Sequence, residues 1–160
     1  MVDEVARDIK IPFRFRRKPR SIPPDLRTDW KVSLLLLILE ISSRGGRSSL
    51  KRLHVLNWAV RSSRHQEEFE ATNTSNTPLF TFNVRFEPAF SLAIDLAVAA
   101  GLTTWEGGDR LELTAIGRST AKGLLKSKDF FIPEVDFLRR VGKSVTEAQA
   151  VSLLKGADIA

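Results

Sequence analysis

The sequence contains no cysteine and only two histidines, His54 and His65. Without cysteine, the chain has neither a disulfide framework nor a thiolate nucleophile or thiolate metal ligand. A zinc site would need carboxylates to complete it, because the two histidines do not stand at helical ligand spacing from each other. The sequence therefore predicts no metal site and no bound cofactor. We interpret His54 as a hydrogen-bonded interior or boundary residue and the nearby Asn57 as a residue that hydrogen-bonds a neighbouring backbone, since no nucleophile stands beside them.

Long apolar runs and leader-like segments are also missing. The longest apolar stretch is Leu34–Leu39, and Glu40 closes it far below the roughly 20 residues that a bilayer-spanning helix needs. Residues 1–8 carry acidic charge, unlike the basic-then-apolar start of a signal peptide. These features predict a cytoplasmic protein with no membrane partner.

Familiar catalytic motifs are absent as well. The chain has no serine nucleophile elbow and no carboxylate pair framed by a pocket-forming pattern. Gly45–Ser49 resembles a phosphate-binding loop only superficially, because it lacks the Gly-Lys-Ser/Thr ending and is expected to follow a helix rather than a strand. We therefore expect a non-catalytic protein with no small-molecule substrate.

What the chain does have is an uneven distribution of charge. Its 160 residues suffice for one hydrophobic core with extensions, and its net charge is +6. Residues 31–65 hold seven Lys and Arg against one Glu, whereas residues 66–115 hold two against eight acidic residues. Each end of the chain adds a further net +3, from eight basic and five acidic residues. A basic first half and an acidic middle bear on the partners of the protein more than on its fold.

Residues 1–29 are predicted to form an extended arm, because Pro12, Pro19, Pro23 and Pro24 prevent any sustained helix. Aromatic and basic side chains alternate in its centre. These residues are Phe13, Arg14, Phe15, Arg16, Arg17 and Lys18. One interpretation is a solvated arm whose phenylalanines pack on the core, and the other is an arm that lies along a phosphate backbone or an acidic protein groove. The sequence does not separate the two.

The first two expected helices differ in charge. Asp29 is the expected N-cap of an apolar helix that ends before Gly45–Gly46. Ser48 or Ser49 is the expected N-cap of a second helix from Leu50 to about Ser62. Basic side chains are expected to project from this second helix and from the turn before it. They are Arg44, Arg47, Lys51, Arg52, Arg61 and Arg64.

The region from residue 65 to 87 has the least regular pattern. Its start is acidic, and residues 72–78 are expected to form a loop. Residues 79–86 alternate with a period of two, which places apolar side chains such as Phe80 and Val84 on one face. That alternation fits a short strand, and the alternative is an irregular stretch that fills a groove.

An apolar helix over residues 88–100 and a hairpin follow. Gly101 suits the end of the helix, and a Gly-Gly-Asp turn joins two expected strands, Leu102–Glu106 and Arg110–Leu113. Thr114 is the expected N-cap of the next helix, which continues to about Ser127. The predicted core includes residues from all these elements. They are Leu36, Ile38, Leu53, Leu56, Trp58, Leu92, Leu96, Leu111 and Leu113.

This order of elements over residues 30–128 resembles a winged helix-turn-helix core. The sequence thus predicts a mainly α protein with a small β-hairpin, of the α+β class. Residues 129–160 are expected to form a C-terminal helical extension packed on the core, with Ser144–Glu147 as the capping box of its last helix, which continues to about Lys155.

The helix before the hairpin carries no Lys or Arg. DNA readers place Arg, Lys, Asn or Gln on that helix to reach base edges, and acidic residues at the hairpin tip would be repelled by phosphates. DNA binding in the usual winged-helix pose is therefore disfavoured, and we expect the hairpin to bind a protein partner. The residues assigned to this wing surface are Trp105, Glu106, Asp109 and Arg110.

A narrower resemblance is carried by residues 43–62, Phe86–Ala89 and Leu113–Arg118. These segments resemble the small middle components of bacterial ABC-three-component systems, which are related to Lamassu-type phage defence. The resemblance covers roughly residues 30–128. It implies an accessory subunit that works with a structural-maintenance-of-chromosomes-like ABC ATPase and an effector subunit to detect foreign or aberrant DNA.

Two functional hypotheses result. In the first, the chain is an adaptor that binds protein, and any DNA contact is non-specific and made through the arm and the second helix. In the second, it is a winged-helix transcriptional regulator that reads DNA with Arg44, Arg47, Lys51 and Arg52. A toxin or antitoxin component is a third and weaker reading.

Overall fold

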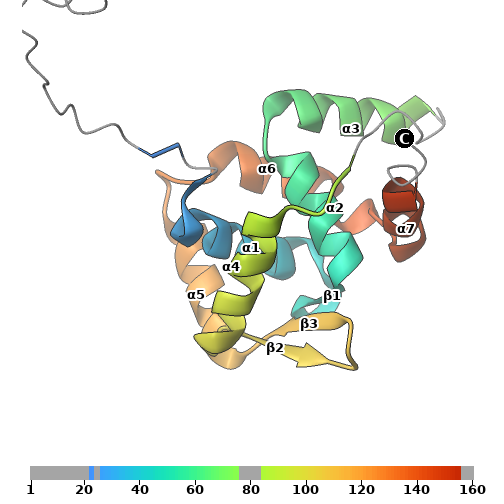
Figure 1. The fold of residues 1–160 in the computed structure, drawn as a ribbon. Coiled ribbons are helices and arrows are strands. Elements are labelled where there is room, and N and C mark those ends of the chain that lie inside the picture. The colour runs from blue at the N-terminus through green and yellow to red at the C-terminus, as the bar shows by residue number, and fades with distance from the viewer. Residues whose placement is uncertain (1–21, 24–25, 76–83, 156–160) are drawn as a thin grey trace, which may run out of the picture.

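The computed structural model describes residues 22–23, 26–75 and 84–155. Over these residues the protein is mainly helical, with a small three-stranded antiparallel sheet (Figure 1). The arm residues Phe13 to Lys18 lie outside the described part. The main helices are α1 Thr28–Ser42, α2 Leu50–Val60, α3 Ser63–Ser75, α4 Pro88–Ala99, α5 Ala115–Lys126, α6 Ile132–Val141 and α7 Glu147–Lys155.

The sheet combines the expected hairpin with a strand that the sequence did not reveal. The hairpin strands are β2 Thr103–Glu106 and β3 Arg110–Leu113, and Gly107 and Gly108 supply the positive φ angles of their turn, 62° and 91°. The additional strand, β1 Arg47–Ser49, pairs with β3, so the order is β1-β3-β2. This pairing joins the basic turn before α2 to the hairpin.

Helix α1 forms the centre of the core, surrounded by α2, α4, α5 and α6 (Figure 1). Leu34–Leu39 is almost fully buried because α1 contacts α2, α4, α5 and α6, which leaves no face for solvent. Most of the predicted core residues are buried as expected. These are Leu36, Ile38, Leu53, Leu56, Leu111 and Leu113, with Trp58 partly buried against them.

The prediction that Leu92 and Leu96 are buried is wrong. Their exposed fractions are 53% and 43%. Helix α4 is apolar except at Ser91 and Asp95, and it turns Phe90 and Ile94 toward the core instead. Residues four positions apart share a helix face, so burying that pair puts Leu92 and Leu96 together on the outer side.

Helix α3 occupies the irregular start of that region and residues 72–75 of the predicted loop, whose remaining residues lie outside the described part. Its one deeply buried apolar side chain, Phe69, packs edge-on against Phe137 of α6, with 6.2 Å between ring centroids. Arg64 and Glu68 form an i,i+4 ion pair at 2.8 Å along its surface. Of the predicted strand, residues 79–83 lie outside the described part, and residues 84–86 have no regular structure.

The expected helix caps are partly confirmed. Ser49 Oγ accepts a hydrogen bond from Arg52 N, and Thr114 Oγ1 accepts one from Gly117 N, so both caps stand as predicted. The cap predicted at Asp29 is wrong, because α1 begins at Thr28 with Arg27 in the N-cap position, and Asp29 falls in its first turn.

The C-terminal capping box is also displaced. Its members are Thr146 and Gln149, whose backbone N–H groups each donate to the other's side-chain oxygen, at 2.9 and 3.2 Å. Helices α6 and α7 pack on α1 and α2, as expected of the C-terminal extension.

Candidate nucleic-acid and partner interfaces

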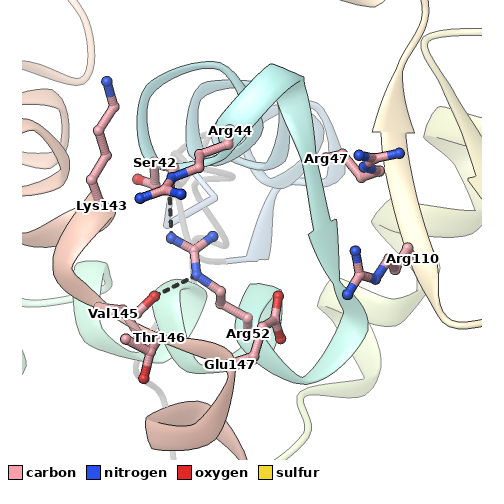
Figure 2. A pocket seen from close by; sticks show the side chains of 9 residues that line it. All are labelled: Ser42, Arg44, Arg47, Arg52, Arg110, Lys143, Val145, Thr146 and Glu147. Atoms are coloured by element: carbon pink, nitrogen blue, oxygen red, sulfur yellow. Dashed lines mark hydrogen bonds between the residues drawn. The ribbon is translucent and has the colours of Figure 1, made fainter.

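A cleft of about 530 Å³ opens where the turn after α1, strand β3 and the start of α7 meet (Figure 2). Five of its lining residues are cations and one is a carboxylate. The lining consists of Ser42, Arg44, Arg47, Arg52, Arg110, Lys143, Val145, Thr146 and Glu147. Figure 2 shows Lys143 on one side and Arg47 and Arg110 on the other. The cleft thus unites two groups that the sequence analysis kept apart, the basic turn and the hairpin.

Arg52 was predicted to be an exposed contact residue, and this is wrong. Its exposed fraction is 6%, and its guanidinium makes five hydrogen bonds of 2.6–3.2 Å. The acceptors are the carbonyls of Ser42, Gly142 and Val145 and the hydroxyls of Ser43 and Ser48. Arg52 therefore fastens the end of α1 and strand β1 to the segment before α7, and it forms the floor of the cleft.

Glu147 lies beside this floor and binds the N-cap of α2. Its carboxylate accepts hydrogen bonds from the Ser49 hydroxyl and, at 3.4 Å, from the Ser49 backbone N–H. Burial lowers the pKa of Arg52 from its ordinary value, and the charge of Glu147 opposes that shift. Glu147 was predicted to serve its own helix as a capping residue, whereas it links α7 to α2.

Arg47 and Glu106, predicted to belong to two surfaces of opposite sign, bind each other. Arg47 Nη1 lies 2.7 Å from both carboxylate oxygens of Glu106. The hydrogen bond and the charge of Glu106 raise the pKa of Arg47. This pair bridges β1 and β2 across the sheet, so the basic turn and the wing form one surface of mixed charge. The expectation that the basic turn and the acidic wing form separate surfaces is therefore wrong.

The remaining predicted contact residues divide between the cleft and other surfaces. Arg44, Arg110 and Lys143 are exposed at the cleft, and their side chains form no hydrogen bond or ion pair with the described residues. Lys51 is exposed but does not line the cleft. Trp105 on β2 is 41% exposed. Asp109 is exposed at the hairpin tip, and its carbonyl accepts a hydrogen bond from Leu50 N at 2.9 Å.

A second candidate interface is the outer face of α4, which packs beside β2. Leu92 and Leu96 are about half exposed there, and the exposed Asp95 lies between them in the sequence. No cation occurs between Pro88 and Ala99. This face offers apolar surface and one negative charge.

The sequence analysis missed a buried polar cluster between α1, α2 and the start of α4. Lys31 is 1% exposed and its Nζ lies 2.6 Å from Glu87 Oε1, while Asn57 Nδ2 donates to Glu87 Oε2 at 2.9 Å. Arg61 lies 3.8 Å from the same carboxylate. Burial alone would raise the pKa of Glu87, but these hydrogen bonds and charges outweigh it and hold the pKa below its usual value. Lys31 among apolar neighbours was the signal available in the sequence.

His54 is buried, as predicted, but it lacks the expected hydrogen bond. Neither ring nitrogen has a partner in the described part of the chain, and the ring lies 4.4 Å from Phe86 and 5.3 Å from Phe90 between centroids. Burial lowers its pKa to about 4, against a weaker opposing effect of Glu87. Asn57 binds a carboxylate rather than the backbone predicted for it.

Within the described ranges, no group of three or more His, Asp or Glu residues is placed to hold a metal ion. None of the helices described is both long and apolar enough to cross a bilayer. No protein-family model matches the chain, and no curated protein or solved structure is significantly similar to it.

Proposed function

We propose that the protein is a non-catalytic winged-helix adaptor of a bacterial anti-phage complex, bridging a structural-maintenance-of-chromosomes-like ABC ATPase and an effector subunit. The helix and strand order supports the winged-helix assignment, because a short strand follows the first helix and joins a hairpin that follows α4. In this arrangement α4 occupies the position of a DNA-recognition helix.

The outer face of α4 is the observation that carries the proposal. Base edges in the major groove are read by hydrogen-bonding side chains, whereas α4 presents Leu92 and Leu96 with Asp95. Asp95 would be repelled by phosphates. Half-exposed leucines are stabilised when a protein surface removes them from water, since complete burial of a leucine side chain contributes about 1.5–3 kcal/mol. A partner protein therefore suits this face better than DNA.

The regulator hypothesis loses two of its four proposed readers. All the N–H groups of the Arg52 guanidinium are used inside the protein, and Arg47 is held by Glu106. Arg44 and Lys51 alone do not form a recognition surface for base edges.

Co-purification with an ATPase and an effector encoded by neighbouring genes tests the adaptor. We expect Leu92→Glu/Leu96→Glu to release the effector and to retain the ATPase. The matched control is Ile116→Glu/Ile132→Glu, which changes two residues that are 64% and 54% exposed on α5 and α6. Recovery of the complete complex with the α4 variant, or an equal loss with the control, would contradict the proposal.

A further inference from the structure

The basic cleft has a net charge of +4 from its lining side chains, five cations against Glu147. Three of these cations, Arg44, Arg110 and Lys143, come from different segments, are exposed, and are unpaired among the described residues. Like charges that converge on a concave surface focus a positive potential and raise the local concentration of anions. The cleft therefore favours an anionic ligand that is long enough to contact all three exposed cations.

The floor of the cleft adds a buried charge. Arg52 is satisfied by carbonyl and hydroxyl oxygens only, and it forms no ion pair with a carboxylate in the described part of the chain. Those neutral acceptors complete its hydrogen bonding but do not cancel its charge. Glu147, the one acid of the lining, accepts hydrogen bonds from Ser49, and its charge also acts on Arg52. The lining nevertheless keeps its net charge of +4, because five cations stand against this single carboxylate.

We propose that this cleft binds the phosphodiester backbone of a nucleic acid, with Arg44, Arg110 and Lys143 as the contact residues. Arg52 is a positioning residue, since its hydrogen bonds hold the segments that carry Arg44 and Lys143. The proposal deepens the proposed function, because it gives the adaptor a defined DNA-binding surface on a different part of the molecule from α4.

The residues that line the cleft suit the phosphodiester backbone of a nucleic acid better than a free nucleotide. Val145 is the one apolar residue of the lining, and no aromatic residue takes part. Nucleotide and cofactor pockets are mostly apolar, and bases of single strands stack on aromatic side chains. Without such a surface the cleft recognises phosphates alone, so binding is indifferent to sequence and strongly dependent on salt.

Fluorescence anisotropy with the full-length chain and two short duplexes of unrelated sequence tests this site. The cleft variant is Arg44→Ser/Arg110→Ser/Lys143→Ser. The control, Lys122→Ser/Lys126→Ser/Arg139→Ser, removes the same charge from exposed positions on α5 and α6. The basic arm is unchanged in all proteins, so its contribution cancels.

We expect wild type and control to bind both duplexes equally, and the cleft variant to bind at least about tenfold more weakly. The slope of log K against log salt should become shallower by about three, one for each phosphate contact removed. The single variant Lys143→Glu should weaken binding in the same direction, and an unchanged melting temperature shows that it folds.

Three results would overturn the proposal. The first is no binding by the wild type, and the second is an equal loss in the control and the cleft variant. The third is displacement of the duplex by micromolar tripolyphosphate at constant ionic strength, which identifies a free phosphate compound as the ligand. Each outcome is separate from the co-purification of the effector, which depends on Leu92 and Leu96.

Discussion

Replacing His54 by leucine should stabilise the protein, and increasingly so as the pH falls. Both ring nitrogens of His54 are buried without partners in the described part of the chain. An unsatisfied buried polar atom costs roughly 1–3 kcal/mol, and leucine has neither nitrogen. At about pH 8 we therefore expect His54→Leu to be at least as stable as the wild type.

The pH dependence gives the sharper test. The pKa of His54 is lowered from 6.5 to about 4 in the folded protein. As the pH falls below 6.5 the unfolded chain binds a proton that the folded protein does not, so folding of the wild type is penalised by about 1.4 kcal/mol per pH unit until the folded pKa is reached. Above pH 6.5 this penalty is absent. His54→Leu should thus gain about 2–3 kcal/mol relative to wild type between about pH 8 and pH 4.5.

Urea denaturation of both proteins at several pH values measures this gain. All other titrating groups are common to the two proteins and cancel in the difference between their free energies of unfolding. If that difference stays constant from about pH 8 to pH 4.5, His54 titrates in the folded protein as it does in the unfolded chain. The burial of the His54 ring against Phe86 and Phe90 would then be refuted.

Three further outcomes follow from the structure. Leu56→Ala, at a fully buried position, should lower the free energy of unfolding by about 2–5 kcal/mol. Leu92→Ala, on the exposed face of α4, should change it by less than about 1 kcal/mol. Equal losses for the two variants in chemical denaturation would contradict the orientation of α4. Arg52→Leu leaves three carbonyls and two hydroxyls without their donor, so we expect a loss of about 3 kcal/mol or more in the same assay, and an unchanged denaturation midpoint would show that Arg52 does not fasten these segments. Glu106→Gln removes the carboxylate that neutralises Arg47, so affinity for duplex DNA should rise, and weaker binding would count against a phosphate contact at this end of the cleft.

Local signals in the sequence were sufficient for several elements. The N-caps were identifiable as Thr114 and as one of Ser48 and Ser49, because a cap requires only a hydroxyl beside the first turn of its own helix, and the structure selects Ser49. The hairpin followed from the Gly-Gly-Asp turn, whose glycines supply the positive φ angles. Such features depend on neighbours in the chain, which the sequence displays directly.

Features that depend on distant partners were not predictable in this way. Nearly all residues of helix α4 are apolar, so its periodicity selects only weakly which side chains face the core, and packing on α1 decides it. Arg52 looks like a surface cation because its acceptors at Gly142 and Val145 lie about ninety positions away in the chain. Helix α3 has a single deeply buried apolar residue, Phe69. One apolar position does not produce the hydrophobic periodicity from which a helix can be predicted.

The candidate site likewise combines residues that were recognisable in the sequence with contacts that depend on distant parts of the chain. The sequence assigned Arg44 and Arg47 to a basic surface and Arg110 to the wing, but it did not bring them together, because β1 and its pairing with β3 were not foreseen. Lys143 was not assigned at all, since it enters the cleft only through the packing of the turn Gly142–Ser144 on α1. The acidity of the wing was overestimated, because Glu106 is neutralised by Arg47.

The most direct test of the central claim is a photo-crosslinking group placed at Leu92 of α4, in the complex purified with its neighbouring gene products and supplied with duplex DNA. The adaptor account predicts that the crosslinks from this position lead to the effector subunit. Crosslinks from Leu92 to DNA would contradict it, because they would place α4 in the groove as a recognition helix.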